Sequence, residues 1–188
     1  YHIKDKIKPM LDNLGIKFTE LKPSMPFTDK MYNYWHKAKD GTLKWGYGWC
    51  GGLCRWGTTE KLTALNKYCK GATQYVGIAA DETKRLERLK IEGKISPLSQ
   101  MGFTEKMCLN YCRSRGFNWK EGDRDLNDIL SRVSCWCCRN KNLKELKNYK
   151  KYLPNYYKRL KALEIVIGEP MKKPYTLKER FEKNDSKN

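Results

Sequence analysis

Three cysteines stand within four residues in the segment Ser134-Cys135-Trp136-Cys137-Cys138-Arg139, and this clustering constrains the chain more than any other feature. Adjacent cysteines are poorly placed to bond each other, so in a disulfide framework each would need its own distant partner. A second pair, Cys50 and Cys54, lies about eighty residues upstream. We expect the two segments to meet in space and to hold a metal ion or an iron–sulfur cluster.

The best predicted ligand set is Cys50, Cys54, Cys135 and Cys138, with Cys137 as an alternate for either of its neighbours. Zinc takes four thiolates in tetrahedral geometry, and a [4Fe–4S] cluster also takes four. The cysteine spacing matches no standard zinc-ribbon pattern, so spacing leaves both metals open. The alternative is that these cysteines are free thiols packed as small apolar residues.

The chain is strongly basic, and the charge is unevenly distributed. Its net charge is +18 over 188 residues, and residues 139–188 hold 15 Lys and Arg against 6 Asp and Glu. Such an excess favours anionic partners: nucleotides, nucleic acid or a sulfate-bearing substrate. The alternative for many of these lysines is a solvated helical surface.

Neither a run of 18 apolar residues nor a secretory signal is visible in the sequence, so we expect no membrane span. Eight cysteines without such a signal are typical of metal-binding or redox use in a reducing compartment. We therefore expect a cytoplasmic protein. The sequence does not indicate an oligomeric state.

Hydrophobic periodicity predicts an alternation of helices and strands, which indicates an α/β fold. Alternating residues predict a strand over 16–21, and the apolar run 74–80 predicts a buried parallel strand. A basic helix is expected to open at Asp81. The other predicted helices cover 3–14, 28–38, 59–68, 104–115, 141–153 and 155–166, the last two divided by Pro154.

Two further expectations concern less regular segments. Residues 39–57 are rich in Gly and Trp and predict a long loop, in which Trp45-Gly46-Tyr47-Gly48 is expected to be packed and to face a ligand. The helix before it should bury Met31, Tyr34 and Trp35.

We assign residues 1–166 to the α/β domain and 167–188 to a basic, flexible tail.

Four segments together resemble the phosphoadenosine phosphosulfate (PAPS) reductase family, of the adenine nucleotide α-hydrolase-like superfamily, and most closely its phage and bacterial members. The resemblance covers about residues 1–165. The first segment is Gly48-Trp49-Cys50-Gly51-Gly52-Leu53-Cys54-Arg55-Trp56-Gly57-Thr58-Thr59-Glu60-Lys61, and the second is Tyr75-Val76-Gly77-Ile78-Ala79-Ala80-Asp81-Glu82 with Arg85. The third is Pro97-Leu98 followed by Gly102-Phe103-Thr104-Glu105, and the fourth is Arg132-Val133-Ser134-Cys135-Trp136-Cys137-Cys138. The resemblance implies a Rossmann-like three-layer sheet with helices, a helical C-terminal part and an adenine nucleotide as substrate.

The chain departs from the family in two respects. The phosphate-binding Ser-Gly-Gly-Lys-Asp-Ser type loop is absent, so we expect it, with one or two strands, upstream of Tyr1 or on another chain. The C-terminal Glu-Cys-Gly-x-His nucleophile motif is absent as well, since residues 139–188 hold no cysteine. The sequence therefore assigns no catalytic residue and leaves the reaction open among reduction, sulfur transfer and adenylyl chemistry.

Five residues are candidates for contact with an anionic nucleotide: Arg55, Lys61, Asp81, Glu82 and Arg85. Arg55 and Lys61 flank a predicted helix start, where backbone amides favour anions. Arg85 follows the predicted strand end, where open α/β sheets bind ligands. The carboxylates could bind ribose hydroxyls or a metal. The alternatives are helix capping by Asp81 and a surface ion pair between Arg85 and Glu82.

The sequence is compatible with two functions. The first is a PAPS-reductase-like enzyme, an oxidoreductase or a sulfur or adenylyl transferase, acting on an adenylylated or sulfur-containing substrate beside a cysteine-held iron–sulfur cluster or zinc. The second is a basic, zinc-stabilised module that binds nucleic acid without catalysis. In that case its C-terminal tyrosines, Tyr149, Tyr152, Tyr156 and Tyr157, would stack on bases between lysines.

Overall fold

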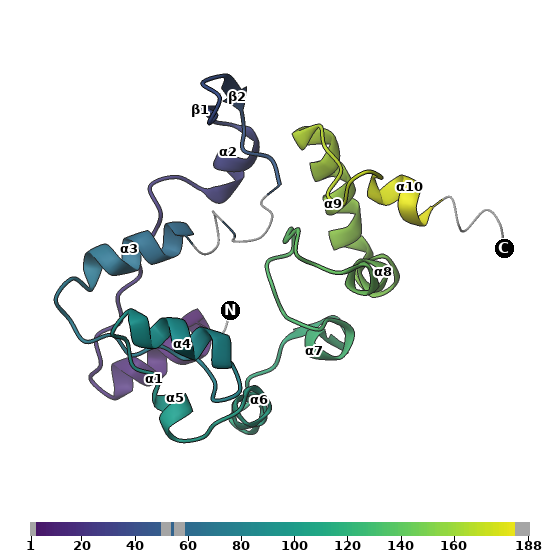
Figure 1. Cartoon of the computed structure of the whole chain (residues 1–188). Coiled ribbons are helices and arrows are strands. Elements are labelled where there is room, and N and C mark those ends of the chain that lie inside the picture. Colours follow the sequence, from purple (N-terminus) through teal and green to yellow (C-terminus); the bar gives the residue numbers. More distant parts are fainter. Residues whose placement is uncertain (1–2, 50–53, 55–58, 183–188) are drawn as a thin grey trace. The chain divides into compact units, whose positions relative to one another are not determined.

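A computed structural model of the chain describes residues 3–49, 54 and 59–182 (Figure 1). The described residues divide into two compact units. The first comprises Tyr1–Leu21 and Leu65–Asn118, and the second comprises Lys22–Ala64 and Trp119–Asn188. Helix α3, Glu60–Tyr68, crosses the division. The structure is mixed α/β, as predicted at the level of class.

The first unit is mainly helical. It begins with a π-helical turn, Ile3–Ile7, that continues into α1, Lys8–Asn13. Its remaining helices are α4, Thr83–Ile91, α5, Pro97–Gln100, and α6, Glu105–Ser114. Helix α6 begins as its sequence predicts, because the Thr104 hydroxyl accepts the Met107 backbone N–H at 3.3 Å.

The predicted strand 74–80 is reduced to a single parallel bridge in a partly buried segment. Tyr75 pairs with Ile95, so that the N–H of Val76 donates to Ile95 O at 2.8 Å and the N–H of Ile95 donates to Gln74 O at 3.0 Å. Helix α4 connects the two partners. This is the connectivity of a short βαβ unit, reduced to a single bridge.

The structure differs from the prediction at residues 16–21, which have no strand partner among the described residues. The only sheets in the described part of the chain are two short antiparallel pairs, both in the second unit. The expected three-layer sheet is therefore not present in the residues that the structure describes. An alternating apolar pattern forms a strand only where a neighbouring strand takes its backbone hydrogen bonds.

The second unit opens with helix α2, Phe27–Tyr32, followed by a hairpin of β1, Trp35–Lys37, and β2, Leu43–Trp45. Trp35 lies opposite Trp45 in the register. The predicted helix 28–38 thus ends earlier, and of its expected buried residues Met31 is buried whereas Tyr34 and Trp35 are exposed. The turn sequence Asp40-Gly41-Thr42 accounts for the difference, because the Asp40 carboxylate accepts the Thr42 N–H and hydroxyl.

The rest of the second unit is helical apart from a two-residue hairpin. Its β3, Lys120–Glu121, pairs with β4, Arg124–Asp125, and is followed by α7, Leu126–Ile129. The predicted helical pair is confirmed as α8, Leu143–Tyr152, and α9, Pro154–Ile167. Proline at the first position of α9 separates them, since it has no N–H to continue α8.

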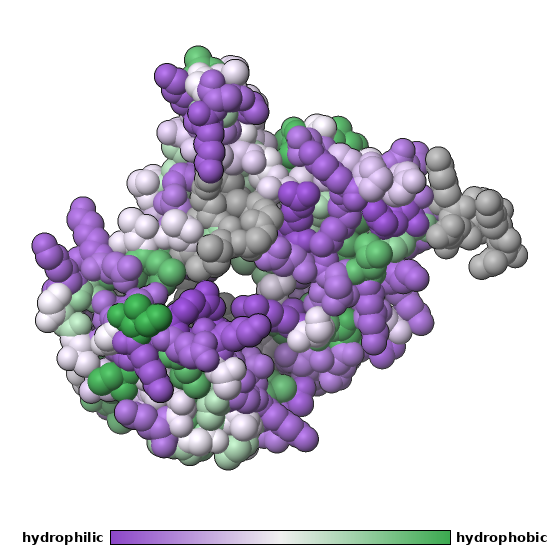
Figure 2. All heavy atoms as spheres, in the orientation of Figure 1, coloured by the Kyte–Doolittle hydropathy of each residue, from purple (hydrophilic) through white to green (hydrophobic). Residues whose placement is uncertain are grey.

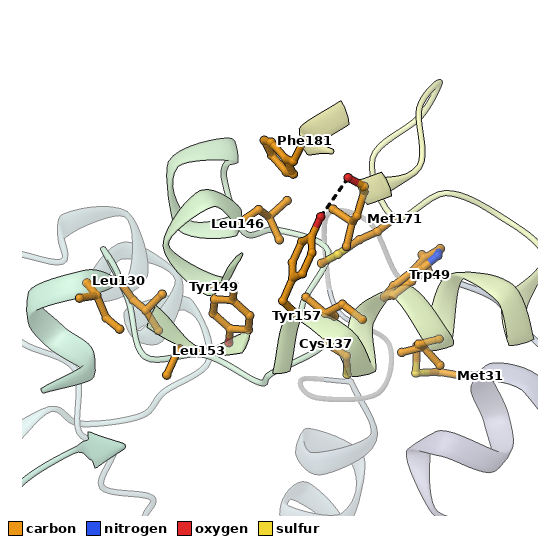
Figure 3. Close-up of a cluster of buried hydrophobic side chains, with 14 residues drawn as sticks. Met31, Trp49, Leu130, Cys137, Leu146, Tyr149, Leu153, Tyr157, Met171 and Phe181 are labelled. Carbon is orange, nitrogen blue, oxygen red and sulfur yellow. Dashed lines mark hydrogen bonds between the residues drawn. The ribbon is translucent and has the colours of Figure 1, made fainter. Parts of the chain in front are cut away.

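The core of the second unit lies between α8, α9 and the segment after α9 (Figure 3). Leu146 and Leu160 are fully buried, and the Tyr157 hydroxyl donates to Leu177 O at 3.0 Å. Met171, Leu177 and Phe181 are buried in the same cluster, and the last two belong to α10, Leu177–Phe181. The expected flexible tail is therefore part of the core up to Phe181, because its apolar residues have this helical pair to pack against.

Hydrophilic side chains cover most of the surface visible in Figure 2, as the composition predicts. In the part of the chain that the structure describes, no helix has both the length and the apolar character to cross a lipid bilayer.

Candidate functional site

The three clustered cysteines lie in a turn that leads into α8. The N–H of Cys138 donates to Cys135 O at 3.0 Å, so Cys135 to Cys138 form a single reverse turn. The turn gives the thiols different surroundings: Cys135 is exposed, Cys138 is half-buried and Cys137 is buried. All of the cysteines that the structure describes are free thiols.

Cys54 and Trp136 pack against the core cluster that contains Cys137. The pKa of the Cys137 thiol is raised to about 11, chiefly by burial and in smaller part by the neighbouring thiols Cys135, Cys138 and Cys54. Thiols from two segments far apart in sequence thus belong to one part of the core. Cys50, the other predicted ligand of the upstream segment, lies outside the described residues.

A buried lysine, which was not among the predicted site residues, lies near the thiols. Lys141 is only 2% exposed, its ammonium donates to the Ser134 hydroxyl at 2.8 Å, and it lies 4.8 Å from the centroid of the Tyr149 ring. Burial lowers the pKa of Lys141, whereas Glu145 and the three clustered thiols oppose that shift. The positive charge therefore lies where thiolate charge would develop.

Glu145 completes this buried group of side chains. Its carboxylate accepts the Ser131 hydroxyl and the Asn142 backbone N–H, both at 2.9 Å, and Asn142 in turn accepts the Glu145 N–H. This reciprocal capping box fixes the start of α8 directly after the cysteine turn. The turn is thereby held on a well-defined helix end.

Within residues 3–49, 54 and 59–182, no three His, Cys, Asp or Glu side chains are arranged to hold a metal ion. The chemistry of the donors nevertheless suits a soft or borderline metal, because thiolate sulfur is a ligand that such metals prefer. The residues fit a thiolate-held metal by chemistry, and their geometry shows three thiols in one turn and a fourth nearby.

The predicted anion-binding residues are divided between the units. Asp81, Glu82 and Arg85 belong to the first unit, whereas the cysteine turn belongs to the second. Lys61 is exposed in the first turn of α3, and Arg55 lies outside the described residues.

Each of the three residues in the first unit has a structural partner. Asp81 accepts the backbone N–H of Glu105 at 3.0 Å, so it caps α6 rather than the helix that follows it in sequence. Glu82 accepts the Ala79 N–H at 3.2 Å and forms an ion pair with Arg85. The side chain of Arg85 is 46% exposed, which leaves its guanidinium accessible to a ligand.

The predicted stacking role of the C-terminal tyrosines is wrong for two of them. Tyr149 and Tyr157 are 3% and 5% exposed, because the helical pair turns both rings into the core. Tyr152 and Tyr156 are half-buried, and Tyr156 packs edge-on against Tyr149 at 6.2 Å. Helical spacing places the rings of Tyr149 and Tyr157 on the apolar face of their helices.

Three comparisons with known proteins gave no similarity to this chain. No protein-family model matches it, no curated protein matches it, and no solved structure matches it.

Proposed function

We propose that this chain is a PAPS-reductase-like nucleotide-binding protein with a cysteine-bound iron–sulfur cluster or zinc, acting on an adenylylated or sulfur-containing substrate. The observation that carries the proposal is that Cys54 packs against the core cluster that contains Cys137, although the two cysteines are about eighty residues apart in sequence. Clustered cysteines that form no disulfide are typical of metal-binding or redox use.

The protein's own side chains would prepare such a centre. The capping box of Asn142 and Glu145 orients the turn, and the Lys141 ammonium offsets thiolate charge on its buried side. A [4Fe–4S] cluster would supply electron transfer there, and zinc would supply a Lewis acid or a structural clasp. Cys135 and Cys138 are the more accessible donors of the turn, and Cys137 is the alternate.

The nucleotide-binding half of the proposal draws on the first unit. The parallel bridge between Tyr75 and Ile95, with α4 between them, is consistent with a Rossmann-like sheet of the adenine nucleotide α-hydrolase type. Arg85 follows that segment, as an anion ligand at the carboxyl end of a parallel strand would. We propose that Asp81, Glu82 and Arg85 of the first unit bind the nucleotide, in a cytoplasmic protein. Arg55 and Lys61 stay candidates from the sequence for contact with an anion.

A basic, zinc-stabilised nucleic-acid-binding module is the second candidate. The net charge of +18 favours it, whereas the burial of Tyr149 and Tyr157 removes two of the four tyrosines that were expected to stack on bases. Only the half-buried Tyr152 and Tyr156 stay available for that role.

The decisive test is the iron, zinc and acid-labile sulfide content of anaerobically purified protein, compared between wild type, Cys135→Ser and Cys69→Ser. Cys69 is a half-buried thiol of the first unit and serves as the matched control. Iron and sulfide in stoichiometric amounts, lost only in Cys135→Ser, would support the first function. Zinc without sulfide would favour the second, and folded protein without any metal would refute the thiol centre in both.

A further inference from the structure

One face of the β1–β2 hairpin (Figure 1) is exposed along its whole length in the residues that the structure describes. Trp35, Lys37, Leu43 and Trp45 alternate with the residues of the opposite face, so their side chains lie on the same side of the two strands. The exposed fractions are 59% for Trp35, 72% for Leu43 and 51% for Trp45. A contiguous apolar face that stays this open is typical of an interaction surface.

The two tryptophans of this face form a pair across the strands. Trp35 lies directly opposite Trp45 in the register, and their rings meet edge to face with centroids 5.0 Å apart and planes at 66°. The contact holds both rings in place, while about half or more of each residue stays accessible. A ring that is both fixed and exposed offers a platform on which another planar group can stack.

Positive charge accompanies the two rings. Lys37 lies on the same face and Lys39 lies in the turn, and both side chains are exposed. The single carboxylate of the hairpin sequence, Asp40, is engaged in the turn, where it accepts the Thr42 N–H at 3.0 Å and the Thr42 hydroxyl at 2.6 Å. The face therefore combines aromatic surface with a positive charge that is suited to an anion.

The opposite face of the hairpin carries mixed charge. Lys44 belongs to that face and lines a pocket that also includes the carboxylate-bearing residue Glu169. Glu169 pairs with Lys173 at 3.2 Å. Because a carboxylate lies on that side, the face that holds the tryptophans is the better one for an anionic partner.

The hairpin is held firmly on the core of the second unit. At its base, the Tyr47 N–H donates to Lys30 O and the Gly48 N–H donates to the O atom of the buried Met31, both at 3.0 Å. Near its turn, the Ala38 N–H donates to Thr42 O at 2.8 Å. The exposed face is thus preorganised, so a partner that binds there loses little free energy to ordering of the chain.

We propose that this face binds single-stranded nucleic acid, with bases stacked on Trp35 and Trp45 and the phosphate backbone paired with Lys37 and Lys39. Aromatic platforms beside a basic track are the means by which proteins bind single strands of varied sequence. Unpaired bases have free faces for such stacking. An anionic lipid surface fits less well, because Lys37, which lies opposite Leu43, would have to enter the apolar layer.

The site goes beyond the proposed function, because it shares no residue with the thiol centre or with the proposed nucleotide site. The test measures binding of a fluorescent thymidine oligonucleotide of about 15 nucleotides to the full chain. Thymine is used so that the proposed adenine nucleotide site is not measured. Trp35→Ala should weaken binding about tenfold and should reduce the quenching of tryptophan emission by the oligonucleotide. Tyr75→Ala is the matched control, since it removes a ring of the first unit that is 68% exposed, and it should leave the affinity unchanged.

A second pair of variants keeps the test valid if Trp35→Ala does not fold. The double variant Lys37→Ala/Lys39→Ala removes two exposed charges and leaves both rings in place. It should reduce the slope of log affinity against log salt concentration by about 1.4, because each phosphate contact with a single strand contributes about 0.7. Lys144→Ala/Lys147→Ala removes two exposed charges from α8 and should leave the slope unchanged.

Three results would overturn the proposal. The first is the absence of oligonucleotide binding at about 50 mM salt, with or without binding to vesicles of anionic phospholipid. The second is unchanged affinity of both hairpin variants, and the third is an equal loss in the hairpin and α8 double variants, which would assign binding to net charge alone. Metal content and the melting shift caused by adenine nucleotide are measured in parallel for each hairpin variant. Both should equal those of wild type, so failure of this surface and failure of the proposed function are separately visible.

Discussion

The buried carboxylate of Glu164 accepts the backbone N–H of Leu177 at 3.0 Å and that of Met171 at 2.7 Å. Glu164 is only 6% exposed, and Leu177 and Met171 are fully buried. One side chain of α9 thus satisfies two amides of the segment that returns over it. The contact holds the last described helix, α10, in the core.

Glu164→Ala should lower the free energy of unfolding by about 3 kcal/mol, because it leaves two buried N–H groups unpaired. Urea denaturation monitored by tryptophan fluorescence would measure the change. Glu169→Ala is the matched control, since Glu169 is exposed and pairs with Lys173 at 3.2 Å on the surface. That control should change stability by less than about 0.5 kcal/mol. Equal effects of the two substitutions would contradict the role assigned to Glu164.

The buried phenol of Tyr149 predicts a loss of stability at high pH. Burial raises the pKa of Tyr149 well above its usual value of 10.0, and Tyr156 and Glu145 add to the shift. Above pH 10 the unfolded chain therefore releases this proton while the folded chain keeps it, so stability falls as the pH rises. The expected slope for one such group approaches about 1.4 kcal/mol per pH unit.

Tyr149→Phe should remove that part of the pH dependence. The quantity to compare is the difference in unfolding free energy between wild type and variant at pH 8 and at pH 11. The wild type should lose more stability than the variant over this interval. Tyr175→Phe is a suitable control, because the side chain of Tyr175 is exposed. Parallel curves for wild type and Tyr149→Phe would refute the prediction.

The helices could be predicted from the sequence more fully than the strands, for a physical reason. Capping signals are local: Pro154 begins α9 and Thr104 caps α6 as their patterns indicate. A strand depends on a distant partner, so residues 16–21 and 74–80 had the right pattern but formed no sheet in the described residues. The β1–β2 hairpin was missed although Asp40-Gly41 is a turn signal between two aromatic segments.

The cysteines of the candidate site stand out in the sequence, whereas the residues that surround them in the structure could not be predicted from it. Three cysteines in four residues are conspicuous in any sequence, whereas Lys141 is one of many lysines in a basic segment. Only the fold shows that its ammonium is buried beside Ser134 and the thiols.

Gly46 should tolerate no side chain. It has φ of +65°, and a Cβ atom there would lie 2.3 Å from Met31 O and 2.8 Å from Tyr32 Cα. Gly46→Ala should therefore lower stability by more than about 2 kcal/mol, through both backbone strain and steric overlap. Gly71→Ala provides the control, because Gly71 has a similar φ of +79° but open space around it, and only the strain of about 1 kcal/mol applies. Thermal unfolding of both variants measures the difference, and equal losses would contradict the steric account.

The ion pair between Arg85 and Glu82 allows structural and ligand-binding roles of Arg85 to be separated. Arg85→Ala breaks a partly exposed pair and should change the stability of the free protein by about 1 kcal/mol or less. Glu82→Ala breaks the same pair and also removes the acceptor of the Ala79 N–H, so it should cost about 1 to 3 kcal/mol more. Only Arg85→Ala removes the cation that would contact a nucleotide phosphate.

If the proposed nucleotide site is correct, adenine nucleotide at a hundred times its dissociation constant should stabilise the wild type by about 2.7 kcal/mol. The stabilisation should be absent in Arg85→Ala. Glu82→Ala should retain part of this stabilisation, because the Arg85 guanidinium is still present and no longer pairs with a carboxylate. Melting temperatures with and without nucleotide provide the measurement. A nucleotide-induced shift that survives in Arg85→Ala would exclude Arg85 from the site and leave its pairing with Glu82 as its only role.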